Sequence, residues 1–324
     1  MMNNSYNADE PKFFGRRKGR VVRKAKSFLL DNMLSQIKVS DVLDFDKDKI
    51  FGTKKNEICL EIGFGDGQHI FGQAKNNPDV GYVGVEVFQN GVANLLSLIS
   101  GIKEGDNLPS MIDALSYDVN NIRVFDDDVR KLFSKIPDGF FDKIFLLFPD
   151  PWPKKKHAGR RFVNPDNLKE IARVLKKGGL FRIATDHKVY KHHVLHTMHE
   201  CKDFYWSAKC GDDWKKEPKD WVRTKYQAKA IREGRKPVSF TGTVILIRIL
   251  LEVLLGSRKV HFLDHKIPLE KFRGKRFFLC DLFELFPNHK AGLGLVSLLL
   301  LGDDRRQIFK NRHFLCTPFC FGSL

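Results

Sequence analysis

The apolar residues of this chain gather into five short runs, several of which end at an acidic residue. Runs of this length without polar alternation are typical of strands that are buried on both faces of a sheet. The predicted strands are residues 57–62, 82–85, 122–125, 143–148 and 180–185. Strands that alternate with helical segments in this way form a doubly wound sheet of parallel strands, so the sequence predicts an α/β fold.

One of the intervening helices has clear boundary signals. Asn164 and Pro165 form a cap and first-turn pair, and apolar residues then recur on one face from Leu168 to Leu175. We expect the two lysines and two glycines of residues 176–179 to end this helix.

Acidic residues stand at or just after the ends of the predicted strands. They are Glu61, Glu86, Asp127, Asp150 and Asp186. Because the carboxyl ends of parallel strands meet at one edge of a sheet, we expect these five side chains to share that edge. In open α/β sheets this is where ligands bind.

The first strand runs into a turn in which Gly63 and Gly65 begin the pattern G-x-G-x-G. Glycines let a backbone approach a ligand closely. The spacing is one residue short of the dinucleotide-binding pattern, and Glu61 beside the turn suits an ammonium group better than a pyrophosphate. The turn therefore favours the methionine end of S-adenosylmethionine over NAD, and an NAD-dependent oxidoreductase is a disfavoured alternative.

Two further acidic positions fit a nucleoside ligand. Glu86 lies roughly 20 residues beyond the glycines, where an acid meets ribose hydroxyls in nucleoside-binding folds. One carboxylate among Asp126, Asp127 and Asp128 is placed to accept the adenine amino group, while the others face solvent or cap the next helix.

The fourth strand ends in the sequence Phe-Pro-Asp-Pro-Trp-Pro at residues 148–153. Prolines cannot continue a sheet ladder, so they hold Asp150 and Trp152 in a rigid extended loop. A carboxylate accepts hydrogen bonds from a base edge, an indole stacks on a base, and cations hold phosphates. The loop predicts a site for a purine in RNA. The cations behind it are Lys154, Lys155, Lys156, His157, Arg160 and Arg161.

Composition supports a polyanionic partner. The chain has 324 residues and a formal net charge of +17, which favours nucleic acid, although charge alone leaves a basic soluble protein or a membrane-surface protein open. A cationic, phenylalanine-containing arm spans residues 12–28 and is either a solvated tail or a segment that lies along RNA. The six cysteines are scattered and the amino terminus carries no secretory signal, so we expect a reducing cytoplasmic location.

Two other clusters have more than one interpretation. His192 and His196 are four residues apart on a predicted helix, but no acidic or cysteine partner completes a zinc site, so an exposed or RNA-facing helix is favoured and no metal is expected. Residues 223–227 either close over the cofactor and base or pack a terminal helix.

Taken with their order along the chain, these motifs resemble those of the bacterial tRNA (guanine-N7)-methyltransferase family, over about residues 17–240. The family belongs to the class I S-adenosylmethionine-dependent methyltransferases, so the resemblance implies a Rossmann-like sheet and a tRNA substrate, methylated on a variable-loop guanosine at position 46. The stretches that carry it are residues 60–65, 84–87, 148–152, 184–186 and 223–226.

The resemblance also implies roles for individual residues. Cofactor contacts would come from Glu61, Glu86, Asp127 and Asp150, beside Gly63 and Gly65. Substrate contacts would come from Lys154, Asp186, Thr224, Lys225, Tyr226 and Gln227. RNA contacts would come from Lys156, His157, Arg160 and Arg161.

The chain departs from the family in two places. Gln227 stands where the family usually has a glutamate, and the chain continues well past the expected final strand near residue 240. We therefore divide it into a basic, partly disordered arm (residues 1–30), a methyltransferase domain (31–240) and an extension of unknown role (241–324). The apolar segments 244–255 and 291–301 are shorter than the ~20 residues of a membrane helix, so no membrane span is expected.

Guanine N7 has an in-plane lone pair and no proton to lose, so methylation needs alignment and charge compensation rather than a strong base. Asp150 is the predicted catalytic residue. No obligate protein partner is evident, and the sequence leaves a monomer and a homodimer open. The alternative function is a non-catalytic RNA-binding protein that retains the fold.

Overall fold

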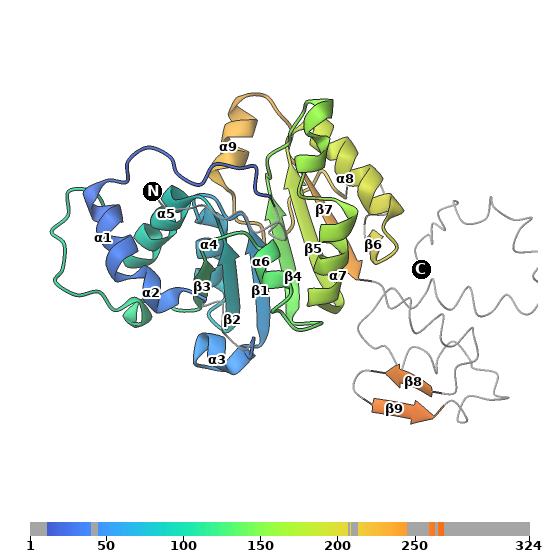
Figure 1. Ribbon diagram of the computed structural model, residues 1–324, viewed down its shortest axis with the longest axis horizontal. Helices are drawn as coiled ribbons and strands as arrows, with labels where there is room; N and C mark the ends of the chain where they lie inside the picture. The colour runs from blue at the N-terminus through green and yellow to red at the C-terminus, as the bar shows by residue number, and fades with distance from the viewer. Residues whose placement is uncertain are drawn as a thin grey trace, which may run out of the picture. The chain divides into compact units, whose positions relative to one another are not determined.

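A computed structural model describes residues 12–39, 45–206, 208, 213–244, 259–262 and 265–268 (Figure 1). The chain divides into two compact units, Met1–Arg248 and Ile249–Leu324. Within the second unit, β8 (Lys259–Phe262) and β9 (His265–Pro268) form an antiparallel pair. The predicted disordered residues 1–10 and the apolar segment 291–301 lie outside the described residues, as does all of segment 244–255 except Val244.

The first unit is built on a seven-stranded sheet in the order β3-β2-β1-β4-β5-β7-β6. The strands are β1 (Glu57–Ile62), β2 (Val80–Val85), β3 (Ile122–Phe125), β4 (Phe141–Leu147), β5 (Leu175–Thr185), β6 (Phe204–Trp206) and β7 (Val238–Val244). The first five pair in parallel, whereas β7 runs antiparallel to both β5 and β6. The five predicted strands are confirmed, and the antiparallel end of the sheet is an addition to them.

Helices precede or connect these strands. They are α1 (Lys24–Asn32), α2 (Leu34–Ile37), α3 (Lys47–Phe51), α4 (Gln68–Asn76), α5 (Gln89–Ser100), α6 (Arg130–Phe133), α7 (Pro165–Val174), α8 (Lys188–Glu200) and α9 (Lys225–Arg232), with short 3-10 turns at Ala114–Ser116 and Lys155–Arg160. Among the described residues, no helix is long and apolar enough to cross a membrane.

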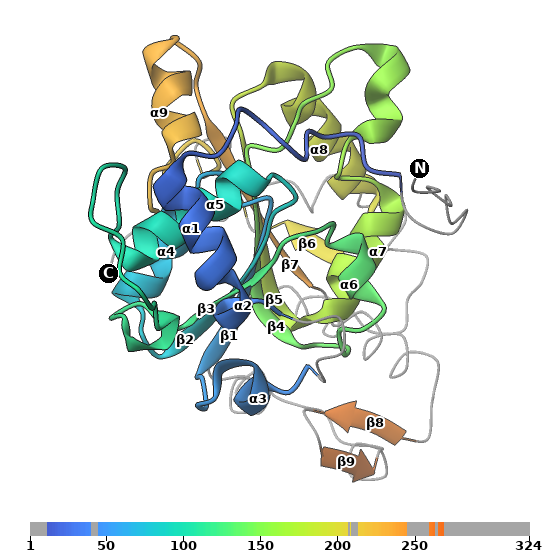
Figure 2. The same cartoon turned by 60° about the vertical axis from the view of Figure 1, so that its left-hand side comes forward.

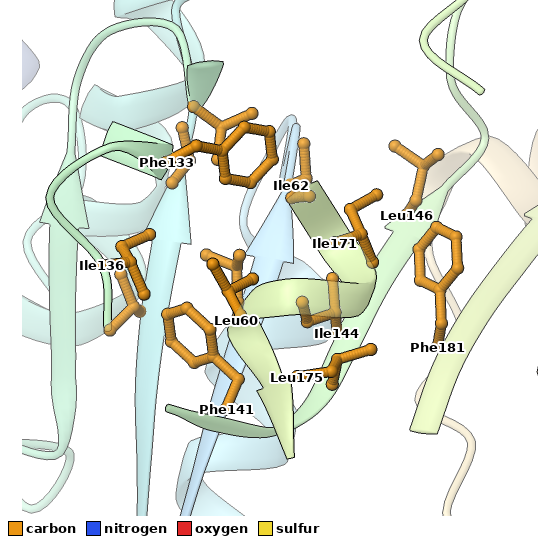
Figure 3. Packing of buried hydrophobic residues seen from close by; sticks show 14 of the residues in the cluster. Leu60, Ile62, Phe133, Ile136, Phe141, Ile144, Leu146, Ile171, Leu175 and Phe181 are labelled. Carbon is orange, nitrogen blue, oxygen red and sulfur yellow. The ribbon is translucent and has the colours of Figure 1, made fainter. Parts of the chain in front are cut away.

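The sheet is buried on both faces because alternate residues of its central strands feed two different cores. Leu60 and Ile144 pack in one core with residues of α7 and α8, whereas Cys59 and Phe145 pack in the other with residues of α1, α4 and α5. Figure 3 shows the first of these cores, with strand side chains directed at Ile171 of α7. This burial on both faces explains why the strands read as apolar runs without alternation.

The helix that follows Asn164 is confirmed, but its predicted end is wrong. The Asn164 side chain caps α7 by accepting from the Asn167 amide, and the helix stops at Val174. Residues 175–185 then form one long strand whose pairing with β4 shifts register between Phe141 and Lys143. Gly178 has a positive φ of 78°, so the lysines and glycines expected to end the helix lie in an irregular first part of β5.

Two elements cross the expected domain boundaries. The helix α1 spans the predicted boundary at residue 30, and β7 continues to Val244, past the one at residue 240. In the segment before α1, the amide of Gln89 donates to the carbonyl of Arg17, and the Gly19 amide donates to Asn90. Figures 1 and 2 show this dark-blue segment crossing the edge of the sheet beside which α9 also lies.

Two of the six cysteines lie in the described part of the chain. Cys59 and Cys201 are free thiols. The other four, Cys210, Cys280, Cys316 and Cys320, lie outside the described residues.

We predict that Gly91→Ala destabilises the first unit. A Cβ at this position of α5 would collide with the carbonyl oxygen of Gly65 in the glycine turn. Overpacking of this kind costs about 1–3 kcal/mol, which urea denaturation will measure. Gly159→Ala is the control, since a Cβ there meets nothing within 4 Å. Equal midpoints for the two variants would contradict the prediction.

Candidate active site

Five of the predicted site residues line one pocket: Glu61, Gly63, Thr224, Lys225 and Tyr226. Asp150, Glu86 and Asp127 are not among its lining residues. The pocket lies at the carboxyl ends of the central strands, as expected for an open α/β sheet. Its lining residues are Glu61, Gly63, Phe64, Asp66, Gln68, His69, Leu147, Phe148, Thr224, Lys225 and Tyr226. The topology therefore brings together motifs that are more than 150 residues apart in the sequence.

The carboxylate of Glu61 is almost completely buried and is paired with a histidine. Only 3% of Glu61 is exposed, and its Oε2 lies 2.7 Å from Nδ1 of His69. The His69 ring contacts Phe145 edge-on and lies 5.8 Å from the Trp221 ring, centroid to centroid. A buried carboxylate requires a charged or hydrogen-bonding partner, and this one faces the glycine turn where an ammonium group is expected.

The glycine turn adopts a backbone conformation that other residues rarely take. Gly63, Gly65 and Gly67 have φ values of 69°, 57° and 77°. Gly63 has open space where a Cβ would stand, whereas a Cβ on Gly65 would lie 3.0 Å from the Tyr226 ring. The turn thus exposes its backbone to a ligand at Gly63 and packs against α9 at Gly65.

Glu86 is buried at the end of β2 and accepts two backbone hydrogen bonds. Its oxygens lie 2.7 Å from the Gly65 amide and 2.8 Å from the Phe88 amide. Burial raises the pKa of Glu86, those two hydrogen bonds oppose the rise, and the charge of Asp150 adds to it. Glu86 and Asp150 are therefore within electrostatic reach of each other.

Asp127 is held by the amino-terminal segment. Its Oδ1 accepts from Arg17 at 2.8 Å, and its Oδ2 accepts from Lys131 at 2.9 Å. Burial acts to raise the pKa of Asp127, but the hydrogen bonds from Lys131 and Arg17 outweigh it and lower the pKa. An adenine amino group would have to share this carboxylate with the two cations or displace one of them.

The proline-rich loop presents Asp150 to solvent from a strained backbone. Phe148 and Trp152 have positive φ values of 53° and 39°, and Asp150 between them is exposed. Left-handed conformations cost a residue other than glycine about 1–2 kcal/mol each. Strain of this kind persists only where surrounding contacts enforce it, and it is common at functional sites.

The cations behind the loop divide into two groups. Lys154, Lys155 and Lys156 are exposed. Arg160 and Arg161 are only partly exposed, and both contact Trp152. His157 stands edge-on to the same indole, 5.7 Å away. The predicted RNA-contacting run therefore includes residues that also pack within the loop.

Comparison with known proteins agrees with this geometry. Residues 55–240 match the family described as "Putative methyltransferase". A tRNA (guanine-N(7)-)-methyltransferase of Chelativorans sp. (strain BNC1) is 41% identical over 231 residues, covering 71% of this chain and 93% of its own. One of Rhodospirillum rubrum is 38% identical over 234 residues, covering 71% and 86%.

This chain belongs to the tRNA (guanine-N7)-methyltransferase family. Among solved structures, "Structure of an Antibiotic Related Methyltransferase" aligns with it at a TM-score of 0.40 and 19% identity, covering 65% of this chain and 97% of its own.

The segment for which the resemblance implies substrate contacts begins α9 and contacts the glycine turn. Thr224 caps the helix by accepting from the amide of Gln227. Lys225 donates its backbone amide to Gln68 at 2.7 Å and its ammonium group to Asp66 at 2.9 Å. That hydrogen bond with Asp66 raises the pKa of Lys225. Of the two interpretations of this segment, the contacts favour closure over the cofactor side of the site.

Gln227, where the family usually has a glutamate, is buried between a donor and an acceptor. Its Oε1 accepts from the indole of Trp221 at 2.6 Å, and its Nε2 donates to Glu217 at 2.7 Å. A carboxylate at this position would face the carboxylate of Glu217. The amide is therefore the side chain that fits the surroundings in this chain.

Asp186 and the histidines have different surroundings from the pocket residues. Asp186 pairs with Arg235 at 3.0 Å and is absent from the pocket lining. His193 contacts the carbonyl of Val163 at 2.6 Å, and His196 pairs with Glu200. In the described parts of the chain, no three histidine, cysteine or acidic side chains are grouped to hold a metal.

Three residues without an expected role contact the predicted site residues: His69, Glu217 and Arg235. His69 contacts Glu61 at the end of β1, and Arg235 contacts Asp186 at the end of β5. Glu217 accepts a hydrogen bond from Gln227 of α9. No local pattern marked these residues. Position alone gave a weak signal for His69, which follows the glycine turn by two residues.

S-adenosylmethionine is the methyl donor of this family, and the residues present fit it. A buried carboxylate at Glu61 suits its ammonium group, the unobstructed Gly63 backbone admits close approach, and Glu86 stands at the next strand end. These groups would hold the donor's methionine and ribose portions.

We predict that Glu61→Gln weakens binding of S-adenosylmethionine on the order of tenfold to 100-fold, because a charged partner for the ammonium group is lost. Equilibrium dialysis with labelled donor measures this. Glu57→Gln is the matched control, since Glu57 lies at the other end of β1 and pairs with Lys143. Donor affinities that are equal in the two variants would exclude Glu61 from the donor site.

Proposed function

We propose that this chain methylates N7 of a guanosine in the variable loop of tRNA, at position 46, with S-adenosylmethionine as the methyl donor. The observation that carries the proposal is the placement of Asp150. It is exposed on a strained loop at the end of the fourth strand, and three exposed lysines follow it. The reaction would take place in the cytoplasm, where tRNA and donor are both present.

The bound donor supplies a methyl group attached to a positively charged sulfur. N7 would bond to the methyl carbon as the methyl–sulfur bond breaks, so that the sulfur leaves as a neutral thioether and the positive charge passes to the purine. The Asp150 carboxylate would stabilise that charge. The same carboxylate can accept hydrogen bonds from the guanine edge, which orients N7 without removing a proton from it. Orientation of this kind contributes several kcal/mol to catalysis.

The exposed cations supply the surface for the RNA backbone. Lys154, Lys155 and Lys156 follow Asp150 directly, and the docked amino-terminal segment adds further exposed cations. Those in the segment are Arg16, Arg17, Lys18, Arg20, Arg23 and Lys24. Because this segment contacts Asp127 through Arg17 and Gln89 through its backbone, it lies at the same edge of the sheet as the predicted donor residues.

Two features motivate the alternative of a non-catalytic RNA-binding protein, the basic amino-terminal arm and Gln227. The contacts of that side chain with Trp221 and Glu217 give it a structural role that does not require loss of catalysis. The retained Glu61, Glu86 and Asp150 support an active enzyme. Donor binding distinguishes the two functions directly.

We predict that Asp150→Asn lowers the rate of methyl transfer at least about 100-fold, since the negative charge that compensates the purine is removed. Unmodified tRNA is incubated with labelled donor, and the nucleosides are analysed for 7-methylguanosine. Affinity for tRNA should stay close to that of the parent. Asp79→Asn is the control, because Asp79 is exposed at the opposite edge of the sheet, just before β2. Parent-like turnover by Asp150→Asn would refute its assigned role.

We predict that the double variant Lys155→Ala, Lys156→Ala weakens tRNA binding and lowers its salt dependence. Each lost phosphate contact reduces the slope of log affinity against log salt by about 0.7–0.9. Binding is measured over a range of salt concentrations. Lys75→Ala is the control, since Lys75 is exposed in the last turn of α4, which runs back toward the opposite edge of the sheet. An unchanged slope would remove both lysines from the RNA surface.

A further inference from the structure

Arg160 and Arg161 belong to the run of cations expected to contact RNA, but both guanidinium groups are directed at Trp152. Arg161 donates from Nη2 to the carbonyl of Trp152 at 3.1 Å and from Nε to the carbonyl of Pro151 at 3.3 Å. The Arg160 guanidinium lies between two rings, 5.0 Å from the centroid of Trp152 and 4.9 Å from that of Phe14. Two separate contacts therefore hold the residue that ends the Asp150 loop.

The backbone that Arg161 binds is the strained part of the loop. Trp152 has a φ of 39°, in the left-handed region that side chains disfavour. The prolines on either side restrict their own φ angles and have no amide hydrogens, so they cannot donate hydrogen bonds that would hold this conformation. A guanidinium fork that bridges two successive carbonyls fixes the peptides on either side of Trp152, two residues after Asp150.

Arg161 is able to act as a brace because the chain behind it is anchored. The carbonyl of Phe162 accepts from the Asn167 side chain at 2.7 Å, and the carbonyl of Val163 contacts Nε2 of His193 at 2.6 Å. Val163 itself is fully buried. The fork thus connects a rigid point beside α7 and α8 to the exposed loop ten residues earlier.

We propose that Arg161 is a positioning residue for catalysis and not an RNA contact: its guanidinium fork holds the Pro151 and Trp152 carbonyls and thereby sets the orientation of the Asp150 carboxylate. Contacts with RNA phosphates in this segment then come from Lys154, Lys155 and Lys156, which are exposed. The inference rests on the proposed methyl transfer to tRNA.

The test separates charge from geometry. Arg161→Lys keeps the positive charge but loses the fork. We expect its single-turnover rate, with tRNA and donor saturating, to fall on the order of 100-fold, the effect of a misplacement of about 1 Å. Affinity for tRNA and its dependence on salt should equal those of the parent. Lys156→Ala is the matched comparison and should show weaker tRNA binding and a shallower salt slope, because an exposed phosphate contact is lost.

Chemical rescue provides a second measurement. In Arg161→Ala, added ethylguanidinium should restore part of the lost rate, whereas ethylammonium, of equal charge, should not. Circular dichroism and thermal melting establish whether Arg161→Ala is folded. If Arg161→Ala is unfolded, the test uses Arg161→Lys alone. A parent-like rate in Arg161→Lys, or a loss of affinity and salt slope like that of Lys156→Ala, would overturn the proposal.

A third measurement does not depend on catalysis. Hydrogen exchange in residues 150–158 of the free protein should be faster in Arg161→Lys than in the parent, because the brace is lost. Unchanged exchange would also overturn the proposal. The activity of the parent protein is measured before any variant is compared. If the parent forms no 7-methylguanosine, the proposed function is contradicted, and not the role of Arg161.

Discussion

The parallel pairing of β1 with both β2 and β4 is the constraint on which the site depends. Glu61 lies opposite Gly84 on one side and Phe145 on the other, so the three strands end at nearly the same level. Because the chain leaves β1 toward β2 and β3 and later returns to β4, the glycine turn lies where the strand order reverses. Glu86 and the Asp150 loop are thereby brought to the same edge, although long segments separate them in the sequence.

Acidic side chains gathered at one edge repel one another, and basic side chains pair with them. Lys225 pairs with Asp66, and both Arg17 and Lys131 pair with Asp127, while the His69 ring is hydrogen-bonded to Glu61. Two of these partners, Arg17 and Lys225, belong to the amino-terminal segment and to α9. Electrostatic compensation therefore gives a physical reason for both segments to fold over the carboxyl edge of the sheet.

Lysine and arginine have different surroundings around the proline-rich loop. Lysine carries a compact, strongly hydrated charge, which suits exposed contacts with phosphates, and the three consecutive lysines are exposed. Arginine has a planar fork of donors and stacks on aromatic rings, and both arginines contact Trp152 in these ways. A loop that must keep two residues at positive φ needs such internal contacts, so net charge alone describes this segment poorly.

The sequence by itself determined the five parallel strands, the glycine turn, the cap of α7 and the acidic residues at the strand ends, because each depends on local periodicity or backbone preference. It did not determine the early end of α7, where pairing of Leu175 with Phe141 converts the expected helix terminus into strand. It also left the partners of Gln227, Asp127 and Arg161 undecided. The contacts of Asp127 and Gln227 depend on tertiary packing, which brings their partners to them. The contact of Arg161 depends on the direction of its side chain within the folded loop. No pattern along the chain encodes either.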